Sequence, residues 1–236
     1  MSPRISVIIP VLNEAGNIGP LLDYLHKEGG EYVEELIVAD GGSTDGTTDI
    51  SKKKGAVTVL APKAGRAVQM NAGAEVISPT STVLYFLHAD TYPPKNFGEK
   101  IAQAINMRAD AGCFKLRFDD PHPLLAGYAW FTRFRSTLLR FGDQSLFVKN
   151  EIFRKVGGFN ESLAVMEDQE LVRKVRKNGR FLLLQDTVVT SARKYRKNGV
   201  LRLQFIFSVI FILYYLGASQ QTLVHLYRNL IRTDLD

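Results

Sequence analysis

Short apolar runs and longer amphipathic segments alternate along the first half of the chain. Continuous apolar runs of this length are typical of buried strands. They occupy residues 5–10, 35–40, 56–61 and 82–90. The segments that follow place apolar residues three or four positions apart, as Ile18, Leu21 and Leu25 show, and this spacing predicts helices. Four strand and helix units in a row predict an α/β fold, in which a mostly parallel sheet is flanked by helices on both faces.

The alternation is less regular in the second half of the chain. The elements predicted there are strands over 113–118 and 145–149 and helices over 123–140 and 168–179. No internal repeat or low-complexity linker separates these segments from the first half. The sequence therefore predicts one continuous domain over residues 1–198, made of two halves, 1–110 and 111–198.

The remaining residues, 199–236, are predicted to form a hydrophobic helical tail. The stretch 205–217 is almost continuously apolar, but Arg202 and Gln204 interrupt its start, so it falls short of the roughly 20 residues of a spanning helix. The alternatives are a buried helix, a helix in a membrane interface and a marginal span. Ten basic residues between 173 and 202 favour an interfacial or partner-covered helix.

Composition and charge narrow the class of protein. A chain of 236 residues with 45% hydrophobic and 23% charged residues is an ordinary globular protein. Cys113 is the only cysteine, which excludes an intramolecular disulfide and a cysteine zinc site. The apolar run that Pro10 ends is too short for a signal peptide, so we expect a cytoplasmic protein. The net charge of +6 fits a solvated face, attraction to substrate phosphates, or peripheral binding to the cytoplasmic face of a membrane.

Polar side chains follow each of the first four predicted strands. They are Asn13 and Glu14, then Asp40, then Arg66, and finally His88 and Asp90. Ligands of open parallel sheets bind beyond the carboxyl ends of the strands, so these residues predict a ligand site. There is no G-x-G-x-x-G after the first strand, and "GGSTDGTT" has Thr47 where a P-loop has its lysine. Both common nucleotide motifs are therefore missing.

Five segments in order resemble the motifs of family 2 glycosyltransferases with the GT-A fold. They are "SVIIPVLNE", "VADGGSTDGT", "GRAVQMNAG", "LHAD" and "MEDQEL", and the resemblance covers roughly residues 4–195. It implies a Rossmann-like sheet whose first half, 1–110, binds a nucleotide sugar and whose second half, 111–198, binds the acceptor. It also implies an inverting transfer from a donor that we expect to be UDP-linked. The acceptor is not specified; a lipid-linked acceptor would suit a membrane-bound tail.

The resemblance implies a divalent metal at the end of the fourth strand. Mg²⁺ or Mn²⁺ that bridges a diphosphate takes one or two protein carboxylates, and Asp90 fits this role. In the family the site is usually an Asp-x-Asp pair, and His88 replaces the first carboxylate. Three roles for His88 stay open, namely a contact to the ribose, ligation of a metal such as Mn²⁺, and capping of a turn.

Other matched residues are implied to bind the nucleotide sugar. Asp40 matches the aspartate that accepts a hydrogen bond from the base, and Arg66 matches a basic residue near the base or diphosphate. Arg66 could equally be a surface arginine at a helix start. Pro10, Asn13 and Glu14 belong to the nucleoside-binding segment, although Asn13 could instead stabilise its own loop.

The catalytic base is implied by "MED" at 166–168. Asp168 would accept the proton of the acceptor hydroxyl, and Glu167 would orient it or act as a second choice. Asp168 also suits a helix N-cap, and both roles are compatible. "FGDQSLFVKNEIFRKVGGF" resembles the acceptor-side segment, which implies acceptor contacts from Asp143 and Gln144.

Processive members of the family carry a late Q-x-x-R-W motif. The matching segment here is "SARKY", with Ser191, Lys194 and Tyr195 at the three defining positions. This difference predicts transfer of a single sugar.

Two other functions fit parts of the pattern. A sugar-phosphate nucleotidyltransferase would also place a metal aspartate on an α/β sheet, but it would not need a base at Asp168. A basic protein that binds membranes or nucleic acid would fit the charge. We expect no nucleic-acid partner, because acids at the strand ends would repel phosphates. A homo-oligomer stays open as a way to cover the tail.

Overall fold

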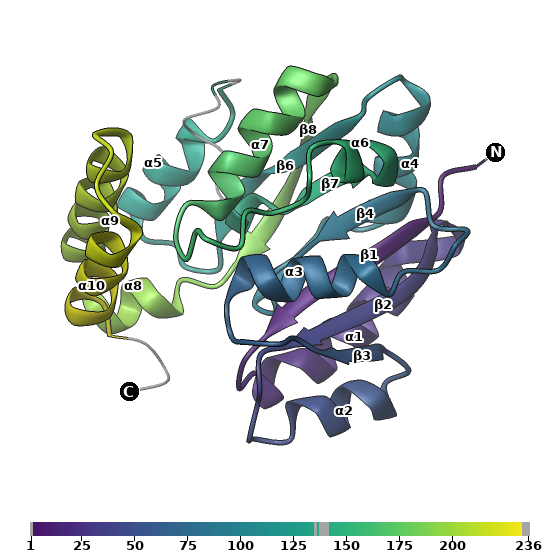
Figure 1. Cartoon of the computed structure of the whole chain (residues 1–236), viewed down its shortest axis with the longest axis horizontal. Helices are drawn as coiled ribbons and strands as arrows, with labels where there is room; N and C mark the ends of the chain where they lie inside the picture. The colour runs from purple at the N-terminus through teal and green to yellow at the C-terminus, as the bar shows by residue number, and fades with distance from the viewer. Residues whose placement is uncertain (1, 135, 137–141, 233–236) are drawn as a thin grey trace.

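The computed structural model describes residues 2–134, 136 and 142–232. Its centre is an eight-stranded sheet with the order β3-β2-β1-β4-β7-β6-β8-β5 (Figure 1). The strands are β1 (Ile5–Val11), β2 (Val33–Asp40), β3 (Val57–Leu60), β4 (Val83–Phe86), β5 (Thr91–Tyr92), β6 (Ala111–Phe118), β7 (Leu146–Lys149) and β8 (Phe181–Thr190). The predicted α/β fold with a mostly parallel sheet and flanking helices is confirmed.

The first half of the sheet is parallel. β1 pairs with β2 on one side and β4 on the other, and β2 pairs with β3. All seven residues of β1 are buried, because helices cover both of its faces. The helices between these strands are α1 (Ala15–Gly29), the 3₁₀ turn η1 (Gly30–Tyr32), α2 (Thr47–Lys53) and α3 (Arg66–Glu75), and α4 (Phe97–Asn106) follows β5.

Alternate residues of β1 enter two different cores. Ile9 packs in the core that includes Leu22 of α1 and Phe97 of α4. Ile8 points the other way, into the core with Met70 of α3 and Leu171. This alternation follows from the period of two along a strand.

The second half of the sheet adds antiparallel pairings. β7 is antiparallel to both β4 and β6, whereas β6 and β8 run parallel. The sequence analysis assigned no element to β8, which carries buried and half-buried residues without regular alternation. The helices here are α5 (Pro123–Phe131), η3 (Gly142–Gln144), α6 (Asn150–Lys155) and α7 (Glu167–Asn178). The helix predicted over 123–140 therefore ends at Phe131, and residues 135 and 137–141 lie outside the described part.

The tail consists of two helices that follow the short α8 (Arg193–Asn198). These are α9 (Val200–Tyr215) and α10 (Gln220–Leu230), and they lie beside α5 at one end of the molecule (Figure 1). α9 buries Leu203 and Ile210, but Phe205 and Leu216 on its other side are 70% and 77% exposed. Over the part of the chain that the structure describes, no helix is long and apolar enough to cross a membrane.

Candidate active site

The chain leaves β1 towards β2 on one side, and β4 lies on the other. The carboxyl ends of β1 and β4 therefore form a point where the strand order reverses, which is where open α/β sheets bind ligands. The predicted strand over 82–90 ends at Phe86, so His88 and Asp90 lie in the loop beyond it. Glu14 lies beyond the end of β1, at the start of α1.

Arg193, the first residue of α8, joins these two strand ends. Its Nη1 atom donates to Oε2 of Glu14 at 3.0 Å, and its Nε atom lies 3.3 Å from Oδ2 of Asp90. Oε2 of Glu14 also accepts from Nδ2 of Asn17 at 2.6 Å. A guanidinium group thus bridges the residues that follow β1 and β4. In the sequence Arg193 is visible only as part of a basic cluster, and its place at the start of α8, shortly after β8, is what brings it to the site.

Charged side chains of both signs surround Asp90. Burial raises the pKa of Asp90, the charge of Asp143 raises it further, and His88, Arg193 and Lys194 oppose this rise. Nδ1 of His88 lies 3.3 Å from Oδ1 of Asp143. Desolvation alone would raise the pKa of Asp143, but the hydrogen bond and charge of His88, followed by the charge of Lys194, lower it to about 2. The cluster therefore contains one carboxylate, Asp90, whose pKa is raised and another, Asp143, whose pKa is lowered.

Asp90 provides one carboxylate, which is enough for a metal ion that is also bound by substrate phosphates. Among the described residues, no three His, Cys, Asp or Glu side chains converge as a metal-binding group. Mg²⁺ needs only one or two protein carboxylates when substrate phosphates and water complete its shell. The residues present fit such a shared site and do not form a metal cage of protein ligands alone.

The residues expected at the nucleoside side tie down the loop after β2. Asp40 is 5% exposed and accepts from the backbone N–H of Ser43 at 3.0 Å. Oδ1 of Asn13 accepts from the N–H of Thr44 at 2.9 Å, and the φ of Asn13 is 54°. Pro10 is buried within β1. Asn13 thus links the loop after β1 to the loop after β2.

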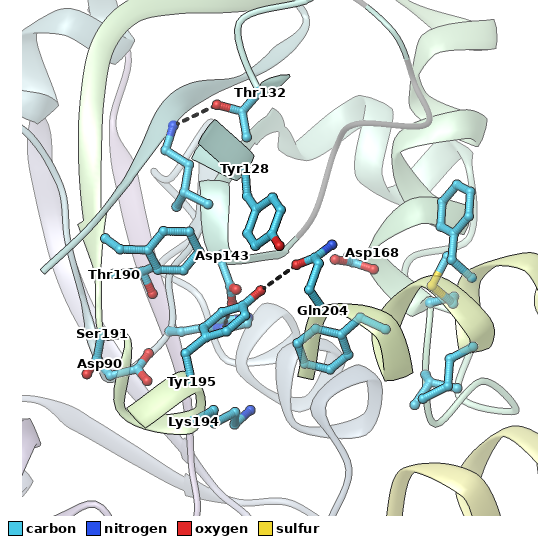
Figure 2. A pocket seen from close by; sticks show the side chains of 18 of the residues that line it. Asp90, Tyr128, Thr132, Asp143, Asp168, Thr190, Ser191, Lys194, Tyr195 and Gln204 are labelled. Atoms are coloured by element: carbon cyan, nitrogen blue, oxygen red, sulfur yellow. Dashed lines mark hydrogen bonds and ion pairs between the residues drawn. The ribbon is translucent and has the colours of Figure 1, made fainter. Parts of the chain in front are cut away.

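Two neighbouring acids at the start of α7 differ in burial and in their contacts. α7 begins at Glu167, whose side chain is 3% exposed and whose Oε1 atom lies 3.6 Å from Nε of Arg66. The charge of Glu167 raises the pKa of Arg66. Asp168 is half-buried and points into the cavity described below (Figure 2). Asp168 is not the N-cap of this helix, because that position belongs to Met166.

One cavity of about 330 Å³ connects the cluster around Asp90 with Asp168 (Figure 2). Arg66, His88 and Asp143 line it as well. Gln144, expected at the acceptor, is 1% exposed and donates from Nε2 to the carbonyl of Phe114 at 3.2 Å. The structure brings Asp143 to the cavity but leaves Gln144 outside its lining.

The far part of the cavity was not predicted, and α5, α8, α9 and α10 contribute to it. Its residues include Tyr128, Phe131, Lys194, Tyr195, Gln204, Phe207, Ile210, Phe211 and Tyr227. Oη of Tyr195 donates to Oε1 of Gln204 at 3.0 Å (Figure 2). Only the "SARKY" segment drew attention to this region in the sequence, because the tail shows no polar motif that marks a site.

The family model of glycosyl transferase family 2 matches residues 6–159. This match covers more than half of the chain, and the protein belongs to this family. The chain is also 25% identical over 205 residues to the succinoglycan biosynthesis protein ExoA of Rhizobium meliloti. That alignment covers 76% of this chain and 60% of ExoA, so the chain spans less than two thirds of its relative.

Solved structures share the fold at low sequence identity. The mannosyltransferase PcManGT from Pyrobaculum calidifontis, in complex with GDP-Man and Mn²⁺, has a TM-score of 0.69 at 21% identity, over 89% of this chain and 63% of that one. S. aureus TarS in complex with UDP has a TM-score of 0.65 at 20% identity, over 80% of this chain and 60% of that one. Both comparisons support the GT-A fold.

Proposed function

We propose that the protein is a metal-dependent, inverting glycosyltransferase that moves one sugar from a UDP-linked donor to an acceptor hydroxyl. The observation that carries this proposal is that Asp90 and Asp168 line one cavity. One carboxylate lies where a diphosphate would need a cation, and the other faces the space where an acceptor would bind. GDP-Man and UDP occur in proteins of this fold, which supports a nucleotide-sugar donor.

The donor would bind across the carboxyl ends of β1, β2 and β4. Asp90 would hold Mg²⁺ or Mn²⁺ together with the diphosphate, and such an ion stabilises the charge that develops on the leaving phosphates. Arg193 and Lys194 would add positive charge on the same side. The loop fixed by Asp40 and Asn13 would receive the nucleoside. Neither side chain would have to reorganise its loop first, because their hydrogen bonds already hold it.

Asp168 would act as the general base. Its carboxylate would take the proton of the acceptor hydroxyl while that oxygen bonds to the anomeric carbon and the bond from this carbon to the diphosphate breaks. One displacement with one base inverts the anomeric configuration. Glu167 is less suited to this role because it is buried and paired with Arg66. It would position Arg66 and the first turn of α7.

We also propose a division of labour along the chain. Residues 1–198 would form the catalytic domain, with the donor at 1–110 and the acceptor at 111–198. The tail, 199–236, would cover the acceptor side and place the exposed apolar face of α9 on an anionic membrane surface, near a lipid-linked acceptor. Support comes from the strong exposure of Phe205 and Leu216, and from the basic segment 193–202, which leads into the same helix.

Thermal unfolding with nucleotides tests the donor assignment. We expect UDP with Mn²⁺ to raise the melting temperature more than UDP alone, and Asp90→Ala to remove this metal-dependent increment. GDP, ADP and UTP serve as comparisons. Stabilisation by UTP with Mn²⁺ but not by UDP, together with release of pyrophosphate, would instead favour a nucleotidyltransferase.

A second measurement tests the base. Asp168→Asn keeps the shape of the side chain but cannot accept a proton, so transfer or donor hydrolysis should fall by about 10²- to 10⁴-fold. UDP binding should stay nearly unchanged. Equal turnover in Asp168→Asn and parent would reject Asp168 as the base.

A further inference from the structure

The cavity that contains Asp168 is lined by a few polar groups and by many carbon side chains. Tyr128 and Gln204 lie on the side of Asp168, whereas Lys194 lies on the side of Asp90 (Figure 2). Carbon side chains from β6, α5 and α9 build much of the remaining wall. These are Leu116, Phe118, Phe131, Phe207, Ile210 and Phe211. The cavity therefore combines the carboxylate of Asp168 with a largely apolar wall.

Several polar groups of the lining are already engaged. Oγ1 of Thr132 accepts from the N–H of Leu116 at 3.1 Å and donates to the carbonyl of Ala129 at 2.7 Å. Nζ of Lys194 donates to Oη of Tyr227 at 3.3 Å. A sugar ring in the apolar part would bury hydroxyls without partners, at a cost of about 1–3 kcal/mol each. An apolar body would bury carbon against carbon and lose no hydrogen bond.

We propose that this chamber is the acceptor subsite, and that the acceptor carries its reactive hydroxyl on an apolar body of aromatic or hydrocarbon character. This inference rests on the proposed function, because it uses Asp168 as the base that the hydroxyl must reach. The hydroxyl lies at Asp168, and the apolar body lies against the carbon side chains of β6, α5 and α9. A volume of about 330 Å³ is within the range of pockets that hold small ligands.

One side of α9 forms part of the cavity wall, and the other side is exposed. Phe207 is half-buried, and its ring centroid lies 6.2 Å from that of Tyr195, so it continues the aromatic lining that begins at α8. Phe205, two residues earlier, is 70% exposed and absent from the lining. The two phenylalanines of one helix thus provide a matched pair, one inside the chamber and one outside.

Binding of 4-alkylphenols to the full chain with saturating UDP and Mn²⁺ tests the inference, measured by calorimetry and ligand-detected NMR. We expect saturable binding that strengthens about fourfold with each added methylene until the chamber is full. Phe207→Ala should weaken binding about tenfold or more, as expected for a lost apolar contact in a pocket. Phe207→Leu should retain most of the affinity, and Phe205→Ala should match the parent.

Further probes distinguish a lipid chain from an aromatic group as the apolar body, and test acceptors that have no apolar body. Farnesol, kept below its aggregation limit, represents a lipid chain, and free glycerol and glucose represent acceptors without an apolar body. Saturable binding of the phenols or of farnesol, sensitive to Phe207→Ala, supports the inference and names the source. Tighter binding of glucose than of any phenol, or equal effects of Phe205→Ala and Phe207→Ala, would overturn it.

The same experiment separates this inference from the proposed function. UDP binding is measured first in each variant, and the melting temperature shows that the variant is folded. A protein that binds UDP with Mn²⁺ but no apolar alcohol refutes the chamber assignment alone. A protein that binds neither UDP nor GDP refutes the donor assignment, whatever its affinity for phenols.

Discussion

Arg193 lies beside Asp90, the carboxylate that would hold a metal ion together with a diphosphate. Arg193 and the metal ion should therefore compete for Asp90, and this competition can be measured. Its Nε atom is 3.3 Å from Asp90, whose side chain is 19% exposed. With an effective dielectric constant near 20, unit charges at that distance attract by about 5 kcal/mol. Desolvation and the ordering of both side chains offset most of this, leaving about 1–2 kcal/mol.

Arg193→Gln removes the competing cation from Asp90. Without nucleotide, we expect this variant to bind Mn²⁺ about 5- to 30-fold more tightly than the parent, because about 1.4 kcal/mol corresponds to a tenfold change. With Mn²⁺ present, UDP should bind more weakly, because the guanidinium no longer contributes charge near the diphosphate. Electron paramagnetic resonance of free Mn²⁺ measures the first effect, and calorimetry with UDP measures the second.

Arg202→Gln is the matched control for this experiment. It removes one positive charge from the same basic segment, but Arg202 is exposed and donates to the carbonyl of Leu230. Its Mn²⁺ affinity should equal that of the parent. Equal Mn²⁺ affinities of Arg193→Gln, Arg202→Gln and the parent would refute the idea that Arg193 competes for Asp90.

Three further predictions concern stability and the tail. Arg66→Met leaves the buried carboxylate of Glu167 unpaired and should lower the free energy of unfolding in urea by about 1–3 kcal/mol. The double variant Arg66→Met/Glu167→Gln should regain much of this stability. Additive losses in the double variant would contradict the pairing. Asp119 holds the start of α8, and although desolvation raises its pKa, hydrogen bonds from Arg196 and the backbone of α8 produce a net lowering. The stability that Asp119 contributes should be present above about pH 4 and disappear as the pH falls through the lowered pKa. The melting temperatures of the parent and of Asp119→Asn should therefore differ at pH 7 and converge in acid. The full chain should float with anionic vesicles at low salt and Phe205→Ser/Leu216→Ser should float less; a parent that stays unbound and forms a defined oligomer would favour a protein partner on this face.

The local patterns of the chain were sufficient for the first half of the fold. Continuous apolar runs indicate buried strands and amphipathic segments of period 3.6 indicate helices, and each pattern is visible within about ten residues. They located β1 to β4 and the helices between them, and the order of the strands placed Glu14, Asp40 and Asp90 at one edge. The family resemblance followed from the same segments, because its motifs lie at these strand ends.

The tertiary structure decided which of these residues share one space. β8 was missed because its burial depends on β6 and β5, which lie far away in the sequence. Which of Glu167 and Asp168 is buried beside Arg66 depends on where α7 begins and on the position of α3, a helix far earlier in the sequence. No local periodicity contains this information, because it arises from the packing of distant elements.

The tail shows the same limit most clearly. Its sequence is apolar around most of α9, so the pattern could not tell Phe207, which lines the chamber, from Phe205, which is exposed. The choice between them is made by the docking of α9 against α5, α8 and α10, since only one side of a helix can meet the domain. The sequence by itself determined that the tail is an apolar helix, and the tertiary structure determined that this helix lines the cavity that also contains Asp168.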